Sequence, residues 1–153
     1  MAFLLRLRPH RSLVMKRGNL LDSMGLPSAS ALHILFVDDD RATRDGYSAY
    51  LETFGYAVMT ASSGADVMAS ALEWHPVVIV LDLGLKDVDG WEVARRLKAD
   101  PRTASVPIIA FTGADLTHER ISAMRAGCDR YLAKPSTPSA LVDQIERCLR
   151  DPA

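Results

Sequence analysis

The chain has 153 residues, of which 48% are apolar and 24% charged, and its formal net charge is −1. This length suits one domain with a core of its own. The two cysteines are too few for a disulfide framework, and no apolar run is long enough to cross a membrane. We therefore expect a cytoplasmic protein that keeps its thiols reduced.

The charge is unevenly distributed along the chain. Residues 1–21 contain no acidic residue and five basic ones: Arg6, Arg8, Arg11, Lys16 and Arg17. Taking these five from the 18 basic residues leaves 13 against 19 acidic residues in 22–153, a balance of −6. Such an acidic body argues against nucleic acid as a partner, and we expect no membrane partner either. We expect residues 1–30 to be a basic, disordered extension, or to precede the true start, and residues 31–153 to form the domain.

The first segments of the expected domain alternate between apolar and amphipathic patterns. Residues 33–37 predict a strand, and residues 41–54 predict a helix because apolar side chains recur there every three or four positions. Residues 57–61 predict a second strand. Residues 63–74 predict a second helix, with Ser63 as its N-cap.

The same alternation continues through the middle of the chain. Residues 77–81 are uniformly apolar and predict a strand buried on both faces. Residues 89–100 predict a helix capped by Asp89, and residues 106–112 predict a fourth strand. Residues 117–127 predict a fourth helix that ends at a glycine.

The last two segments complete the pattern. Residues 129–133 predict a fifth strand, and residues 137–150 a fifth helix with Thr137 as N-cap and Pro138 at its first position. Five strands alternating with five helices predict an α/β fold in which helices cover both faces of a parallel sheet. Right-handed crossovers favour a flavodoxin-like, doubly wound (βα)5 sheet with strand order 2-1-3-4-5.

Polar residues follow or end four of the predicted strands. The acidic triplet 38–40 follows the first strand and Asp82 the third, while Thr112 ends the fourth and Lys134 follows the fifth. Parallel strands deliver their carboxyl ends to one edge of the sheet, where ligands bind near the switch point of the strand order. We therefore expect these side chains to lie together.

The chemistry of this edge indicates a cation. Two carboxylates about 4 Å apart repel by roughly 4 kcal/mol at an effective dielectric constant near 20. Oxygen ligands without histidine or cysteine favour Mg²⁺. A site that combines Mg²⁺, a carboxylate, a lysine and a threonine suits phosphoryl transfer, with Asp82 as the nucleophile that forms an acyl phosphate. Lys134 and the hydroxyl of Thr112 would contact the phosphoryl oxygens.

Four fragments carry a resemblance to a known family. In chain order they are ILFVDDD (34–40), VIVLDLGLKDVDG (78–90), IIAFTGAD (108–115) and YLAKP (131–135). Together they resemble the receiver domain of a two-component response regulator. Within that family the chain is similar to the single-domain members, such as the chemotaxis regulators. The resemblance covers about residues 32–151.

The resemblance implies a role for each matching acidic residue. Asp82 matches the phosphoacceptor. Asp38 and Asp39 match the acidic pair at the metal, with Asp39 the direct ligand and Asp38 often acting through water. The backbone carbonyl of Gly84 matches the remaining protein ligand of a Mg²⁺ ion that Asp82 also contacts.

Further roles follow on the neighbouring strands. Thr112 matches the switch hydroxyl, Tyr131 the switch aromatic and Lys134 the lysine of the family. The resemblance implies a cis bond between Lys134 and Pro135. Many members have a proline four residues after the acceptor, where this chain has Lys86, so we expect a looser and more charged loop.

As a function, the resemblance implies a stand-alone receiver. A histidine kinase or a histidine phosphotransfer protein would phosphorylate Asp82, and the response would reach a downstream protein through the face made by helix 117–127, strand 129–133 and helix 137–150. The chain would be a signalling switch, not an enzyme in the usual sense, since it would catalyse only its own phosphorylation and dephosphorylation.

Two alternatives remain open at this point. A haloacid-dehalogenase-type phosphatase would use Asp38 as the nucleophile and Asp40 as the acid/base, but the chain is short for that family. A pseudo-receiver would only dock to a partner without being phosphorylated. Labelling with acetyl phosphate separates the three, because each places the label on a different residue or on none.

Overall fold

The computed structural model describes residues 31–113 and 118–151, and it is built around one sheet of five parallel strands in the order β2-β1-β3-β4-β5. The strands are β1 His33–Val37, β2 Ala57–Ala61, β3 Val78–Leu81, β4 Ile108–Thr112 and β5 Arg130–Ala133. The helices are α2 Arg41–Glu52, α3 Gly64–Trp74, α4 Gly90–Ala99, α5 His118–Arg125 and α6 Pro138–Arg150. This confirms the flavodoxin-like fold and the strand order expected from the sequence.

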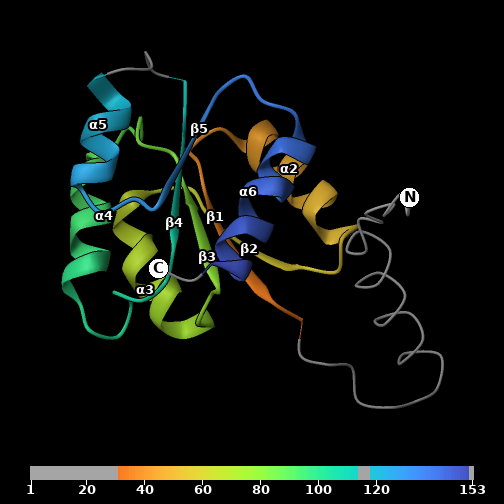
Figure 1. Ribbon diagram of the computed structural model, residues 1–153, viewed down its shortest axis with the longest axis horizontal. Coiled ribbons are helices and arrows are strands. Elements are labelled where there is room, and N and C mark those ends of the chain that lie inside the picture. The colour runs from red at the N-terminus through yellow and green to blue at the C-terminus, as the bar shows by residue number, and fades with distance from the viewer. Residues whose placement is uncertain (1–30, 114–117, 152–153) are drawn as a thin grey trace, which may run out of the picture.

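The helices lie in two layers, one on each face of the sheet (Figure 1). Helices α3, α4 and α5 cover one face, and α2 and α6 cover the other. Successive residues of a strand point to opposite faces, so Leu35 and Val37 enter the first core and Ile34 and Phe36 the second. Both faces of the central strands are therefore buried, which explains their uniformly apolar sequence.

Several boundaries differ from the sequence expectation by one or two residues. Helix α2 ends at Glu52 because Thr53 and Phe54 donate to carbonyls three residues back and Gly55 has a φ of +87°. Strand β4 begins at Ile108 because the amide of Val106 donates to Thr103 in a turn.

Ser63 is a correction of a different kind. It does precede α3, but its hydroxyl donates to the carboxylate of Asp66 at 2.7 Å and makes no capping hydrogen bond to the helix. The amides of Gly64 and Ala65 are instead bound by Asp87, which lies far along the chain. The expected caps at Asp89 and Thr137 are confirmed, because their side chains accept hydrogen bonds from the amides of Trp91 and Ala140. Asp40 likewise caps α2 by accepting from the amide of Thr43.

The expected extension over residues 1–30 lies outside the described residues, as does Thr117, where we expected a helix to begin. Within 31–113 and 118–151, no helix is both long enough and apolar enough to span a membrane.

The start of α4 approaches the backbone after β3 very closely. A Cβ on Gly90 would lie 2.5 Å from the Cα of Leu83 and 2.9 Å from the carbonyl oxygen of Asp82. Backbone atoms cannot move aside as a flexible side chain can, so this position requires glycine.

We expect Gly90→Ala to lower the free energy of unfolding by about 2–3 kcal/mol, because the added methyl group overlaps backbone atoms. Gly46→Ala in α2 is the control, since nothing lies within 4 Å of its Cβ position. That variant should gain about 1 kcal/mol from the better helix propensity of alanine. Urea unfolding measures both, and a Gly90→Ala variant as stable as the wild type would contradict the close approach.

Candidate functional site

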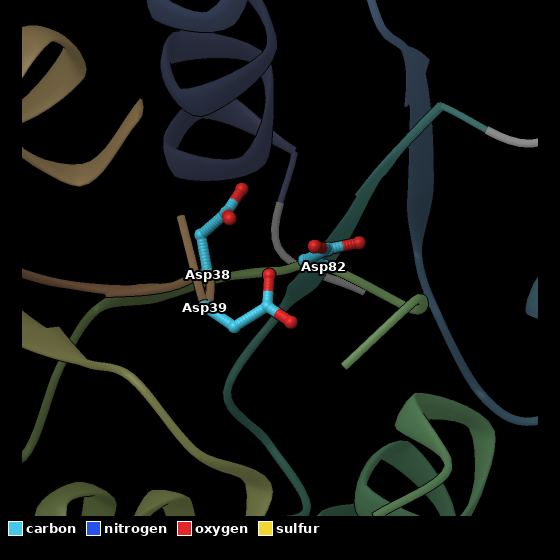
Figure 2. A group of neighbouring side chains, drawn as sticks. All are labelled: Asp38, Asp39 and Asp82. Carbon is cyan, nitrogen blue, oxygen red and sulfur yellow. The ribbon is translucent and has the colours of Figure 1, made fainter. Parts of the chain in front are cut away.

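Three carboxylates meet at the carboxyl edge of the sheet. Asp38 and Asp39 follow β1, and Asp82 follows β3, whose Leu81 is in register with Val37 of β1. One oxygen from each carboxylate lies within 4.8 Å of the others. In Figure 2 the side chain of Asp39 extends from the end of β1 toward the side where Asp82 lies. The register of two neighbouring strands thus creates the acidic cluster.

Two of the three carboxylates are buried, and both are paired with one lysine. Asp38 is 1% exposed and Asp82 7% exposed, and burying such groups is costly without a partner. The Nζ atom of Lys134 donates to Oδ2 of Asp38 at 2.5 Å and lies 3.5 Å from Oδ2 of Asp82. One ammonium therefore serves two of the three carboxylates, and the cluster retains an excess of negative charge.

The surroundings shift the proton affinities of both partners. Burial raises the pKa of Asp82, while the amide of Gly84 and the charge of Lys134 act in the opposite direction. Burial by itself would lower the pKa of Lys134, but the hydrogen bond to Asp38 and the negative charge of Asp82 outweigh it and leave that pKa above its ordinary value. Lys134 is therefore a cation at neutral pH.

The oxygen atoms of the cluster fit a hard divalent cation. Asp38 accepts from the amide of Asp40 and from Lys134, and Asp82 accepts from the amide of Gly84 at 2.9 Å. The Oδ2 atom of Asp39 is buried and has no hydrogen-bond partner within the described part of the chain. Such an oxygen is expensive to leave unsatisfied. A Mg²⁺ ion, which prefers carboxylate oxygens and keeps several waters, would satisfy it.

Two aromatic side chains stabilise the position of Lys134 and its loop. The Nζ atom of Lys134 lies 5.0 Å from the centre of the Phe111 ring, within range of a cation–π interaction. Tyr47 packs edge-on against Phe111, and its hydroxyl donates to the carbonyl of Ser136 at 2.5 Å. These contacts fix both the lysine and the loop that carries it. The bond between Lys134 and Pro135 is cis, as the resemblance implies.

The remaining residues expected at the site lie on its border. Thr112 ends β4 with 2% exposure, and its carbonyl accepts from the amide of Lys134 at 2.9 Å. Gly84 is exposed next to Asp82. Tyr131 lies on β5, half-buried against the core under α3, α4 and α5. Asp40 does not join the cluster, because its carboxylate binds the amide and the hydroxyl of Thr43 at the start of α2.

Sequence reasoning missed three contributors to this site. The guanidinium of Arg44 donates to the backbone carbonyl of Asp38 at 2.6 Å, while Tyr47 and Phe111 hold Lys134 and its loop. Arg44 is the fourth residue of α2, and no sequence spacing indicated that its side chain turns back to the end of β1. Tyr47 and Phe111 follow apolar patterns and gave no signal beyond core packing.

Comparison with curated proteins shows which known proteins this chain is similar to. A family model for the response regulator receiver domain matches residues 34–146. The DNA-binding dual master transcriptional regulator RpaA of Synechocystis is 38% identical over 117 residues, covering 76% of this chain and 48% of that protein. The transcriptional regulatory protein GltR of Pseudomonas aeruginosa is 35% identical over 123 residues, covering 80% and 51%. The chain thus spans about half the length of the curated relatives it matches.

Solved structures agree with this comparison. A CheY-like response regulator receiver domain protein from Methanospirillum hungatei has a TM-score of 0.74 at 28% identity, covering 79% of this chain and 95% of that one. The receiver domain of sensor histidine kinase PA1611 from Pseudomonas aeruginosa has a TM-score of 0.74 at 30% identity, covering 80% and 100%. That second structure contains a magnesium ion coordinated in its active-site cleft.

We expect Asp39→Asn to weaken Mg²⁺ binding at least about tenfold, because it removes the charge of a carboxylate whose Oδ2 atom is buried without a partner among the described residues. Isothermal titration calorimetry with MgCl₂ measures the effect. Asp40→Asn is the matched control, since it removes a charge from the next residue while asparagine can still cap α2. Equal affinities of the Asp39 and Asp40 variants would contradict the assignment.

A second prediction concerns pH in metal-free buffer. The pKa of Asp82 is higher in the folded state than in the unfolded state. The Asp82 carboxyl therefore stabilises the folded state at pH values below its unfolded pKa. This stabilisation is lost as the pH rises through the pKa of the folded state. Asp82→Asn removes the buried charge and should be more stable than the wild type at pH 7 by about 1 kcal/mol. The difference should shrink as the pH falls toward 4. Urea unfolding across this range tests the sign, and a variant less stable than the wild type at pH 7 would refute it.

Proposed function

The chain belongs to the family of response regulator receiver domains, and we propose that it accepts a phosphoryl group on Asp82 from a histidine kinase or a histidine phosphotransfer protein. The observation that carries this proposal is the position of the Asp82 carboxylate. It lies beside two further carboxylates and 3.5 Å from the ammonium of Lys134, at the edge of the sheet where the polar strand ends converge.

The transfer is an in-line exchange of two bonds at phosphorus. A carboxylate oxygen of Asp82 attacks the phosphorus of phosphohistidine, a P–O bond forms, and the P–N bond breaks. The imidazole leaves with the electron pair of that bond and is neutral when its other ring nitrogen carries a proton. The chain acts here as a switch that catalyses only its own phosphorylation and dephosphorylation.

The surrounding residues balance the negative charge of the phosphoryl oxygens during this transfer. Asp38, Asp39, Asp82 and the backbone carbonyl of Gly84 would hold Mg²⁺, which supplies positive charge to the phosphoryl oxygens when bound. Lys134 is placed to pair with one of these oxygens, since its ammonium already lies beside Asp82. Part of its contact with the carboxylates is then exchanged for a contact with the phosphoryl group.

The output of the switch is a change of packing on the face made by α5, β5 and α6. In our proposal the hydroxyl of Thr112 donates to the new phosphoryl group, and Tyr131 moves into the space that Thr112 vacates. The two arrangements differ in which surface they present, so phosphorylation shifts a population between them. Support comes from the burial of Thr112 and from the position of Tyr131 on the neighbouring strand, in register with Ala110 of β4.

A downstream protein is the partner that this face suits. Ile121 and Met124 on α5 are 49% and 51% exposed, and their spacing of three residues makes them neighbours on the surface of that helix. The charge balance of −6 over residues 22–153 favours a protein over nucleic acid. We therefore propose a cytoplasmic receiver domain formed by residues 31–153 that signals through a protein contact at this face, with residues 1–30 as a basic extension.

Acetyl phosphate labelling in the presence of Mg²⁺, followed by peptide mapping, tests the phosphorylation site. We expect one label on Asp82 and none in Asp82→Asn. Asp89→Asn is the control, because Asp89 lies in the same loop and only caps α4. A label on Asp38 with turnover would instead indicate the phosphatase, and no label at all would indicate a docking module; both outcomes overturn the proposal.

A further inference from the structure

The loop from residue 83 to residue 89 connects the end of β3 to α4, and a remote carboxylate contact holds it. The Oδ1 atom of Asp87 accepts from the amide of Gly64 at 2.9 Å, and its Oδ2 atom accepts from the amide of Ala65 at 3.2 Å. The first amides of a helix have no partner within the helix. Asp87 thus caps α3 from a different part of the chain and ties the loop to that helix.

Close packing reinforces this tie. A Cβ on Gly64 would lie 3.0 Å from the Cβ of Val88 and 3.5 Å from a methyl group of Leu85. Leu83 and Leu85 are 6% and 8% exposed and belong to the core under α3 and α4. The loop is therefore confined on the side of α3, and its apolar residues are anchored in the core.

The tied loop carries a residue of the proposed metal site. Gly84 lies three residues before Asp87, and its amide donates to Oδ1 of Asp82 at 2.9 Å. Lys86, the residue before Asp87, is exposed, so its side chain does not anchor the loop in the core. The restraint on the loop must come from other contacts in this chain.

We propose that Asp87 is a positioning residue, which holds Gly84 against Asp82 by anchoring the loop to the first amides of α3. It touches none of the reacting groups itself and acts through the backbone of residues 84–87. The hydrogen bond from Gly64, followed by that from Ala65, keeps the pKa of Asp87 below its ordinary value, so its carboxylate is charged at neutral pH. A negative charge at this end of α3 also interacts favourably with the helix dipole. The part of the proposal that concerns the metal rests on the proposed function.

A helix cap alone would stabilise α3 without affecting Gly84, so the experiment has to separate the two roles. Asp66 offers a matched control. It lies in the first turn of the same helix and accepts from Ser63, but among the described residues it makes no hydrogen bond or ion pair with the loop. Asp66→Ala removes a similar charge near the same helix end, and Asp87→Asn keeps an acceptor oxygen in place.

The first measurement uses metal-free protein. Amide hydrogen exchange followed by NMR should show the Gly84 amide of Asp87→Ala exchanging about tenfold faster than in the wild type, after correction for the change in global stability. Asp66→Ala should leave this rate within about twofold, and Asp87→Asn should restore most of it. Asp87→Ser is a second truncation, in case the alanine variant fails to fold.

The second measurement is Mg²⁺ affinity by calorimetry. We expect Asp87→Ala to weaken binding by about tenfold, the size typical of groups that orient a metal ligand, and Asp66→Ala to leave it unchanged. If Asp87→Ala and Asp66→Ala behave alike in both measurements, Asp87 is only a helix cap and the proposal fails. If the wild type binds no Mg²⁺, the proposed function fails, while Gly84 exchange still decides whether Asp87 anchors the loop.

Discussion

The carboxyl edge of the sheet depends on the contacts that the ammonium of Lys134 makes with two buried carboxylates. Asp38 and Asp82 are almost fully buried, and their mutual repulsion would destabilise the fold without a nearby cation. Lys134 contacts both, and the ring of Phe111 lies beneath its Nζ atom. A single side chain thus allows two buried carboxylates to lie close together in the folded protein.

The register of the parallel strands is what brings these groups together. Val37 pairs with Leu81 and Thr112 with Ala133, so the residues that follow each strand arrive at a common edge. Below this edge both faces of the sheet are packed against helices (Figure 1). The side chains of the proposed site are therefore carried by short segments that follow a sheet packed on both faces.

Much of this site could be predicted from the sequence because it follows from a rule of topology. Strand ends in a parallel sheet share an edge, so Asp38, Asp39, Asp82 and Lys134 could be placed together from their positions alone. The order of the strands followed from the alternation of patterns and the handedness of crossovers. The roles of Thr112, Tyr131 and the Gly84 carbonyl stay predictions, since they concern a phosphorylated or metal-bound state.

What the sequence did not reveal are contacts between residues far apart in the chain. Ser63 has the residue type and position of a local cap, yet Asp87 binds the amides of α3 from 23 residues beyond Gly64. The role of Phe111 depends on which face of β4 it occupies and on the loop beyond β5. Such contacts depend on tertiary packing, for which local periodicity carries no information.

The coupling between Lys134 and Asp38 is the most direct test of this account. A double-mutant cycle with Lys134→Met and Asp38→Asn, measured by urea unfolding in metal-free buffer at pH 7, gives their interaction energy. We predict a favourable interaction of about 2 kcal/mol, as expected for a buried and hydrogen-bonded ion pair. Single-variant effects that add within about 0.5 kcal/mol would show that Lys134 does not hold the carboxylates in place, and would contradict the account.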